Sequence, residues 1–148
     1  RSVLIDQSSI RFLTNDEIER YRKIDLIRDF IDQHQEEHEA FKQENKITED
    51  TLLDGKRLTN SKLFRAYTMA FLKAHPKIHT NRYTLLVRQM EPNASQGLPL
   101  EVYCFTNDID WGAYEDIQGD IFDHLLAAMP EFGLRAYQRN ALVDSRLQ

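Results

Sequence analysis

The segment of residues 97–135 constrains the fold of this chain more than any other stretch. Residues 98–105 alternate apolar and polar side chains, which is the two-residue period of a half-buried strand. A helix with an apolar face follows, capped by Asn107 or Asp108 and ended by Pro130 and Gly133, and residues 134–139 return to a strand pattern. The segment therefore predicts a sheet with a helix packed on it. The expected buried face of that helix is Trp111, Tyr114, Ile117, Ile121, Phe122, Leu125 and Ala128.

The N-terminal part of the chain predicts two short strands and a long helix. Residues 2–5 and 9–13 are β-type runs separated by a turn, and Thr14 and Glu17 then have the spacing of a capping box. Beyond the apolar stripe of this helix, residues 32–45 are acidic, and we expect them to form a solvated extension. The stripe consists of Ile18, Tyr21, Ile24, Ile27 and Ile31.

The middle of the chain predicts another helix and a hairpin. Thr59 has the position of a helix cap, and Pro76 closes the amphipathic pattern that follows it. Residues 83–90 and 98–105 predict antiparallel neighbouring strands joined by a polar loop. The apolar face of the helix is Leu63, Phe64, Tyr67, Ala70, Phe71 and Ala74.

These elements predict an α+β fold. Apart from a long helical insert after the first strand, their order is strand, helix, strand, strand, helix, strand. That is the βαββαβ order of ferredoxin-like domains, with a four-stranded antiparallel sheet and both helices on one face. We divide the chain into a strand segment (1–13), a partly solvated helical insert (14–60), the remainder of the α/β domain (61–139) and a tail (140–148).

Strand alternation separates the two faces of the predicted sheet. The set that includes Leu98, Leu100, Val102 and Cys104 should lie under the helices. The opposite set mixes apolar and aromatic residues with arginines, a composition that suits a subunit or domain interface. The alternative is that the first strand segment or the acidic helix folds over that face. The candidate interface residues are Leu86, Arg88, Met90, Tyr103, Phe105, Arg135 and Tyr137.

Composition excludes several classes of function. The 148 residues are 41% hydrophobic and 29% charged, as in a globular domain, and the net charge of −5 argues against nucleic-acid binding. Cys104 is the single cysteine, so no disulfide can form within one chain. The longest apolar run, 125–129, is far shorter than the roughly 18 residues that a membrane helix needs. The chain begins with Arg1 already in a strand pattern, so we expect a piece of a longer protein or a processed product.

The candidate chemical clusters favour structural interpretations. Pro76 separates His75 from His79, which removes the shared helix face that a metal site would use. His34 and His38 have helical spacing but acidic neighbours, and we expect a solvated face. Asp116, Asp120, Asp123 and His124 lie opposite the apolar face of their helix, so we expect surface charge. We predict no catalytic residue, no cofactor and no metal.

The chain resembles the C-terminal domain of mechanosensitive channels of the small-conductance (MscS-like) family, in their miniconductance branch. Two of the similar blocks are Gly97-Leu-Pro-Leu-Glu101 and Pro130-Glu-Phe-Gly-Leu-Arg135. Each block is weak alone, but together they extend over nearly the whole chain. The other blocks are residues 1–12, 58–60, 64–67, 75–79, 84–89 and 117–124.

The resemblance implies a bacterial inner-membrane channel that opens under bilayer tension after osmotic shock. It implies that this segment follows the membrane helices and a small β-domain, and that it lies on the cytoplasmic side. There, such domains from several subunits, usually seven, form a cage. The homo-oligomer would then use the interface face defined above. Pore and gating residues would lie outside this chain.

Three other functions fit the same topology. A soluble ferredoxin-like module could bind a small regulatory molecule, because fold alone does not decide function. An acylphosphatase-like hydrolase would need an anion-cradling loop after the first strand, and Asp6 makes residues 6–9 a poor cradle. RNA binding could use Tyr103, Phe105 and Tyr137 for stacking, but the acidic balance argues against it.

Overall fold

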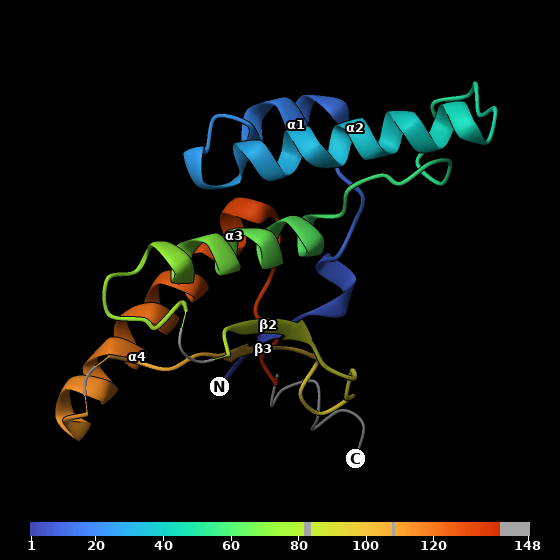
Figure 1. Cartoon of the computed structure of the whole chain (residues 1–148). Coiled ribbons are helices and arrows are strands. Elements are labelled where there is room, and N and C mark those ends of the chain that lie inside the picture. Colours follow the sequence, from blue (N-terminus) through green and yellow to red (C-terminus); the bar gives the residue numbers. More distant parts are fainter. Residues whose placement is uncertain (82–83, 108, 140–148) are drawn as a thin grey trace, which may run out of the picture.

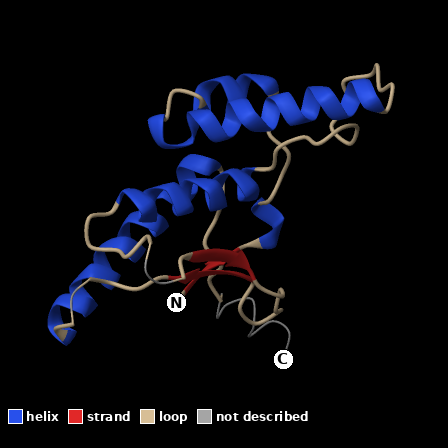
Figure 2. Ribbon diagram, viewed as in Figure 1, coloured by secondary structure: helices blue, strands red, loops and turns tan. Residues whose placement is uncertain are grey.

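The computed structural model describes residues 1–81, 84–107 and 109–139. They form three layers: a small sheet, a middle layer of α3 (Asn60–Ala74) and α4 (Trp111–Ala128), and an outer layer of α1 (Asn15–Tyr21) and α2 (Arg28–Glu44) on the far side of α3 (Figure 1). Figure 2 shows all strands together at one end of this stack. Tyr83, Asp108 and the predicted tail, 140–148, lie outside the described residues.

The described part of the sheet has three strands in the order β1-β3-β2. β1 (Ser2–Ile5) and β2 (Leu86–Gln89) each pair antiparallel with the central β3 (Leu98–Tyr103). The α+β class and the antiparallel hairpin are therefore confirmed.

The expected fourth strand, 134–139, is wrong as a full strand. Only Ala136 pairs, through an isolated bridge to Ile5 beside β1. The backbone N–H of Arg135 donates to the Ser9 hydroxyl at 3.1 Å, so it is not available to extend the ladder. The predicted strand at 9–13 is also wrong: the 3-10 turn Gln7–Ser9 (η1) occupies its start, and Phe12 forms a single bridge to Thr59.

The predicted start of the first helix is confirmed. The Thr14 hydroxyl accepts from Glu17 N–H, and the Glu17 carboxylate accepts from Thr14 N–H, which completes the capping box. Arg11 also donates to Glu17 at 2.6 Å, and this hydrogen bond is the main reason that the pKa of Glu17 is lowered to about 2. One carboxylate therefore joins the helix start to the segment before it.

The single long helix expected after Thr14 is wrong. α1 ends at Tyr21, and a turn and the 3-10 segment Asp25–Ile27 (η2) precede α2. Arg28 Nε donates to Arg22 O at 2.8 Å, and Arg22 Nε contacts Asp32 at 2.7 Å. These contacts satisfy the end of α1 and hold α2 beside it, as Figure 1 shows.

The solvated face expected for His34 and His38 is also wrong. The two residues are only 5% and 8% exposed, and they continue along α2 the buried stripe that begins at Ile27, the last residue of η2, and Ile31. The loop after α2 folds back over them: Lys56 N–H donates to His38 Nδ1 at 2.9 Å. Gly55, at φ +81°, lies so close that a Cβ there would be 2.5 Å from the His38 ring. The histidines therefore belong to the insert's own packing.

Both buried histidines should make the stability of the insert depend on pH. Burial is the main cause that lowers the pKa of each below its ordinary value, and the charge of Lys62 (for His34) or Arg57 (for His38) adds to it. The unfolded chain then binds more protons than the folded chain, so protonation favours unfolding. We expect full stability above about pH 6.5, and loss as the pH falls through the lowered folded-state values.

Urea unfolding at about pH 7.5 and about pH 5.5 measures this effect. The other charged groups around the pair are Lys56 and Glu37 near His34, and Lys42, Glu39 and Asp50 near His38. The double variant His34→Gln/His38→Gln should lose most of the difference between the two midpoints, whereas His75→Gln should keep it. An equal difference in both variants would contradict the assignment.

The predicted caps of the two later helices have different outcomes. Thr59 caps α3 as expected, accepting from Lys62 N–H at 3.1 Å, and α3 ends at Ala74 before Pro76. Asn107 does not cap α4; the cap is Asp110, whose carboxylate accepts from Ala113 N–H at 3.1 Å. Trp111 was expected in the buried face of α4 but is 76% exposed, because the first turn of α4 extends beyond the packed body (Figure 1).

The core lies between the sheet and the helices. Leu98, Leu100 and Val102 of β3 are buried under α3 and α4, as the parity of the strand predicts. At the other end of the core, Phe132 of the 3-10 segment Met129–Phe132 (η3) lies among the rings of Tyr21, Phe64 and Tyr67. Gly133 then takes a left-handed conformation at φ +69° and ends the segment.

Candidate interaction surface

The sheet face that points away from the helices contains most of the predicted interface residues. The register of β2 and β3 places Leu86 opposite Tyr103 and Arg88 opposite Glu101. Arg88 and Glu101 form an ion pair with an N–O distance of 3.0 Å. The rings of Tyr103 and Phe105 meet edge to face, with their centroids 5.5 Å apart. We call Leu86, Arg88, Met90, Tyr103 and Phe105 the outer sheet face.

The outer sheet face combines apolar side chains with substantial exposure. Leu86 is 36%, Tyr103 47% and Phe105 38% exposed, and Met90 is half-buried. These are large apolar groups next to a charged pair, on a sheet whose opposite face is filled by core residues. Contiguous apolar surface rimmed by charge is typical of sites that contact another molecule.

The alternative prediction, that the first strand segment or the acidic helix folds over this face, is wrong for the described residues. The acidic helix α2 lies on the opposite side of the molecule, separated from the sheet by α3 (Figure 2). The first strand segment contributes β1, which is a strand of the sheet and not a layer over it. Neither of these two segments shields the outer sheet face.

Two predicted interface residues, Arg135 and Tyr137, lie apart from the outer sheet face, beyond β1. Arg135 pairs with Asp6 at 3.3 Å and donates to the Ser8 hydroxyl at 3.0 Å. The hydrogen bonds from Ser8 and Arg135 lower the pKa of Asp6. The Tyr137 hydroxyl donates to the carbonyl of Ala94 at 2.9 Å. Both side chains are therefore held by local contacts at the edge of the sheet.

Tyr137 also packs against a glycine that the hairpin loop needs. Gly97 has φ +69°, and a Cβ there would lie 2.8 Å from the Cβ of Tyr137 and 2.7 Å from the carbonyl oxygen of Ile5. Only glycine allows this close approach without displacing the backbone of β1. The role of Tyr137 is thus to join the segment after η3 to the β2–β3 loop.

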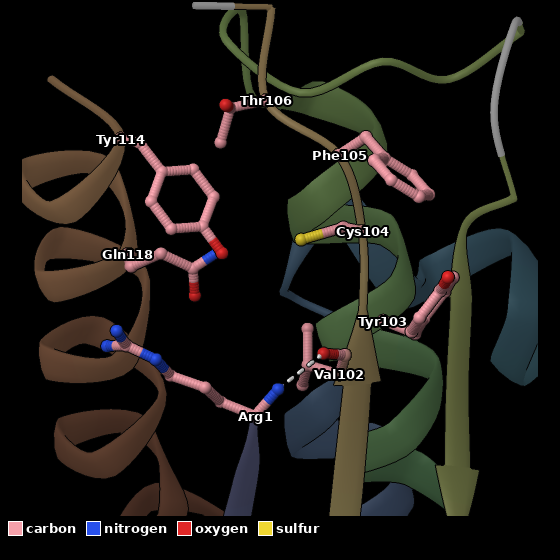
Figure 3. Close-up of a pocket in the computed structure, with 8 residues that line it drawn as sticks. All are labelled: Arg1, Val102, Tyr103, Cys104, Phe105, Thr106, Tyr114 and Gln118. Atoms are coloured by element: carbon pink, nitrogen blue, oxygen red, sulfur yellow. Dashed lines mark hydrogen bonds between the residues drawn. The ribbon is translucent and has the colours of Figure 1, made fainter. Parts of the chain in front are cut away.

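A cavity of about 430 Å³ lies on the helix side of the sheet, between β3 and α4. Figure 3 shows Val102 of β3 and Cys104 just after it directed into the cavity, whereas Tyr103 and Phe105 point to the other side of the chain. Tyr114 and Gln118 reach into it from α4. Burial raises the pKa of the Cys104 thiol, which disfavours its reactive thiolate form.

Gln118 is the residue of this cavity that sequence reasoning missed. It is only 5% exposed, and no hydrogen bond joins its side-chain amide to another described residue. The sequence feature that could have identified it is a polar amide next to Ile117 on the apolar face of the helix. A side-chain amide that lines a cavity can donate to and accept from a polar molecule or water bound there.

The predicted acidic cluster on α4 has the expected exposure. Asp116, Asp120, Asp123 and His124 are all exposed. His124 stacks on Phe71 at 4.0 Å, and its Nε2 lies 2.7 Å from the Tyr67 hydroxyl. Among the residues that the structure describes, no group of three or more His, Cys, Asp or Glu side chains could hold a metal ion.

The helices in the described ranges include none with the length and apolar character needed to cross a membrane. No family model matches the chain, and no solved structure matches it.

Proposed function

We propose that this chain is the cytoplasmic C-terminal domain of a mechanosensitive channel subunit of the MscS-like family. In this proposal the domain forms part of an oligomeric cage below a bacterial inner-membrane pore and contributes to the response to osmotic shock. The sequence blocks described above support the family, and the outer sheet face supports the assembly role. The domain itself is assigned no catalytic activity.

The observation that carries the assembly role is the composition of the outer sheet face. Leu86, Tyr103 and Phe105 keep more than a third of their surface exposed, and the described helices all pack on the other side of the sheet. Burial of such aromatic side chains against a neighbouring subunit would be favourable, and Arg88 could form charged hydrogen bonds at the rim. A homo-oligomer would bring one such face to each subunit boundary.

Charge reversal at Arg88 in the intact channel tests this role. We expect Arg88→Glu to reduce the oligomer fraction, because it sets two carboxylates opposite each other at Glu101 and removes a cation from the contact. Tyr103→Ser should act in the same direction through lost apolar contact. The oligomer fraction is measured by light scattering after size exclusion in detergent.

Lys23→Glu is the matched control, because Lys23 is exposed in the turn after α1, far from the sheet. It should leave the oligomer unchanged. If Arg88→Glu and Tyr103→Ser both assemble like the unmodified channel while remaining folded, the outer sheet face is not a subunit contact.

A soluble regulatory module that binds a small molecule is the second candidate. The cavity beside Gln118 favours it, because the amide of this residue lines the cavity and could bind a polar ligand. A ligand that binds only the folded chain raises its midpoint of thermal unfolding. A metabolite library should then contain a compound that shifts the midpoint of the chain but not of Gln118→Leu.

A further inference from the structure

Two large apolar side chains at the N-terminal end of α4 are exposed to solvent. Ile109 is 103% exposed and Trp111 is 76% exposed, on either side of the cap residue Asp110. We call these three residues the α4 tip. Asp116, one and a half turns further along the helix, is also exposed. The tip therefore presents an aromatic anchor in an acidic setting, a combination suited to a contact with another protein surface.

A groove between α2 and α3 has complementary properties. Two adjoining hollows of about 220 Å³ and about 300 Å³ share Phe30, Ala66 and Met69, where α2 meets α3. We call them together the α2–α3 groove. Alanines at positions 66 and 70 leave depth along one face of α3, and Leu26, 42% exposed, extends the apolar lining.

Charge distinguishes this groove from an ordinary apolar hollow. All of its charged lining residues are cationic: Lys62, Arg65 and Lys73, spaced along α3. Arg65 Nε is also buried without a hydrogen-bond partner in the described part of the chain. An incoming carboxylate would balance these charges, as the acidic α4 tip could supply.

We propose that the α4 tip of one copy of this chain docks in the α2–α3 groove of a second copy. Within one copy the two surfaces cannot meet, because Ile117, Ile121 and Leu125 anchor α4 in the core and direct its tip away from α2 (Figure 1). The contact joins two different surfaces, so it is head-to-tail: the copy that supplies its tip keeps a free groove, and the copy that supplies its groove keeps a free tip. It extends the self-association proposed above to a surface distinct from the outer sheet face.

The fluorescence of Trp111 tests the docking directly, since it is the only tryptophan of the chain. We expect its emission maximum to move to shorter wavelength as the concentration of the 148-residue chain rises, in step with the mass from light scattering. Ala66→Glu, which fills the groove, and Lys73→Glu, which reverses an exposed rim charge, should each weaken association at least tenfold. Leu53→Ser removes another exposed apolar side chain and should have no effect.

Mixing two variants tests the head-to-tail geometry. Trp111→Ala retains only the groove and Ala66→Glu only the tip, so each alone should be monomeric and an equal mixture should form a one-to-one dimer. Circular dichroism confirms that both are folded. Emission typical of exposed tryptophan at every concentration, with a monomer mass, would overturn the proposal, as would a shift that appears only with another protein.

Arg88→Glu separates this proposal from the proposed function. If the tip docks in the groove, the Trp111 shift should persist in Arg88→Glu, whose altered side chain lies on the outer sheet face. A shift lost in Arg88→Glu but kept in Ala66→Glu would overturn the docking while supporting the sheet contact. Arg88→Glu could abolish channel assembly while the emission maximum of Trp111 in the unmodified chain does not change with concentration. That result would support the proposed function and overturn the docking.

Discussion

Phe132→Ala should lower the free energy of unfolding by about 3–5 kcal/mol, the usual cost of deleting a buried aromatic ring. Phe132 is 2% exposed, and three rings surround it. Its centroid lies 5.3 Å from that of Tyr21 in a stacked arrangement, 5.5 Å from Phe64 and 5.2 Å from Tyr67. Because Tyr21 belongs to α1 and the other two to α3, the truncation opens a cavity where two layers and η3 meet.

Urea denaturation followed by circular dichroism measures this loss. Phe105→Ala is the matched control, since the same substitution on the partly exposed outer sheet face should cost about 1 kcal/mol or less in the isolated chain. Phe132→Leu should recover part of the loss by refilling the cavity. A cost for Phe132→Ala no larger than that of Phe105→Ala would show that the aromatic cluster is not central to stability.

Local sequence signals predicted local structure well. Two helix starts were predicted correctly, one from Thr14 with Glu17 and the other from Thr59, because a helix cap depends only on residues within one turn. The break after Tyr21 could not be predicted in this way. Ile18 to Ile31 keep helical spacing through the break, and the contacts that stabilise the reversal come from Arg28 and Asp32, one helix later.

Long-range pairing limited the prediction of the sheet. Alternation placed Leu98, Leu100 and Val102 in the core correctly, because parity is a property of one strand. Whether residues 134–139 complete a fourth strand depends instead on what binds Arg135, and Ser9, distant in sequence, competes for its N–H.

The candidate sites show the same division. Parity identified the outer sheet face, including Tyr103 and Phe105, and Figure 3 shows these two on the side of β3 away from the cavity. Two other features arise only when helices pack: the burial of His34 and the α2–α3 groove. The prediction that Trp111 is buried was wrong. An amphipathic pattern identifies the side of a helix that faces the core, but it does not show how far the core extends along the helix.

Asn60 joins three segments that are far apart in sequence. Its side chain is fully buried, and its Oδ1 accepts from Arg11 N–H at 3.0 Å. Its Nδ2 donates to the Ser9 carbonyl at 2.9 Å and lies 3.5 Å from the carbonyl of Gly133. The amide therefore uses both its acceptor and its donor group to hold the segment before α1 and the end of η3 against the start of α3.

Asn60→Ala should lower the free energy of unfolding by about 2–4 kcal/mol, because it leaves Arg11 N–H and the Ser9 carbonyl without their partners in a site closed to water. Asn60→Asp preserves the acceptor but cannot donate to Ser9 and buries a charge, so it should cost at least as much near neutral pH. Asn81→Ala, at an exposed position, is the matched control. Urea midpoints for the three variants decide the matter: if Asn60→Asp is as stable as the unmodified chain, the donor half of the amide contributes nothing, and the link between Ser9 and α3 must come from packing alone.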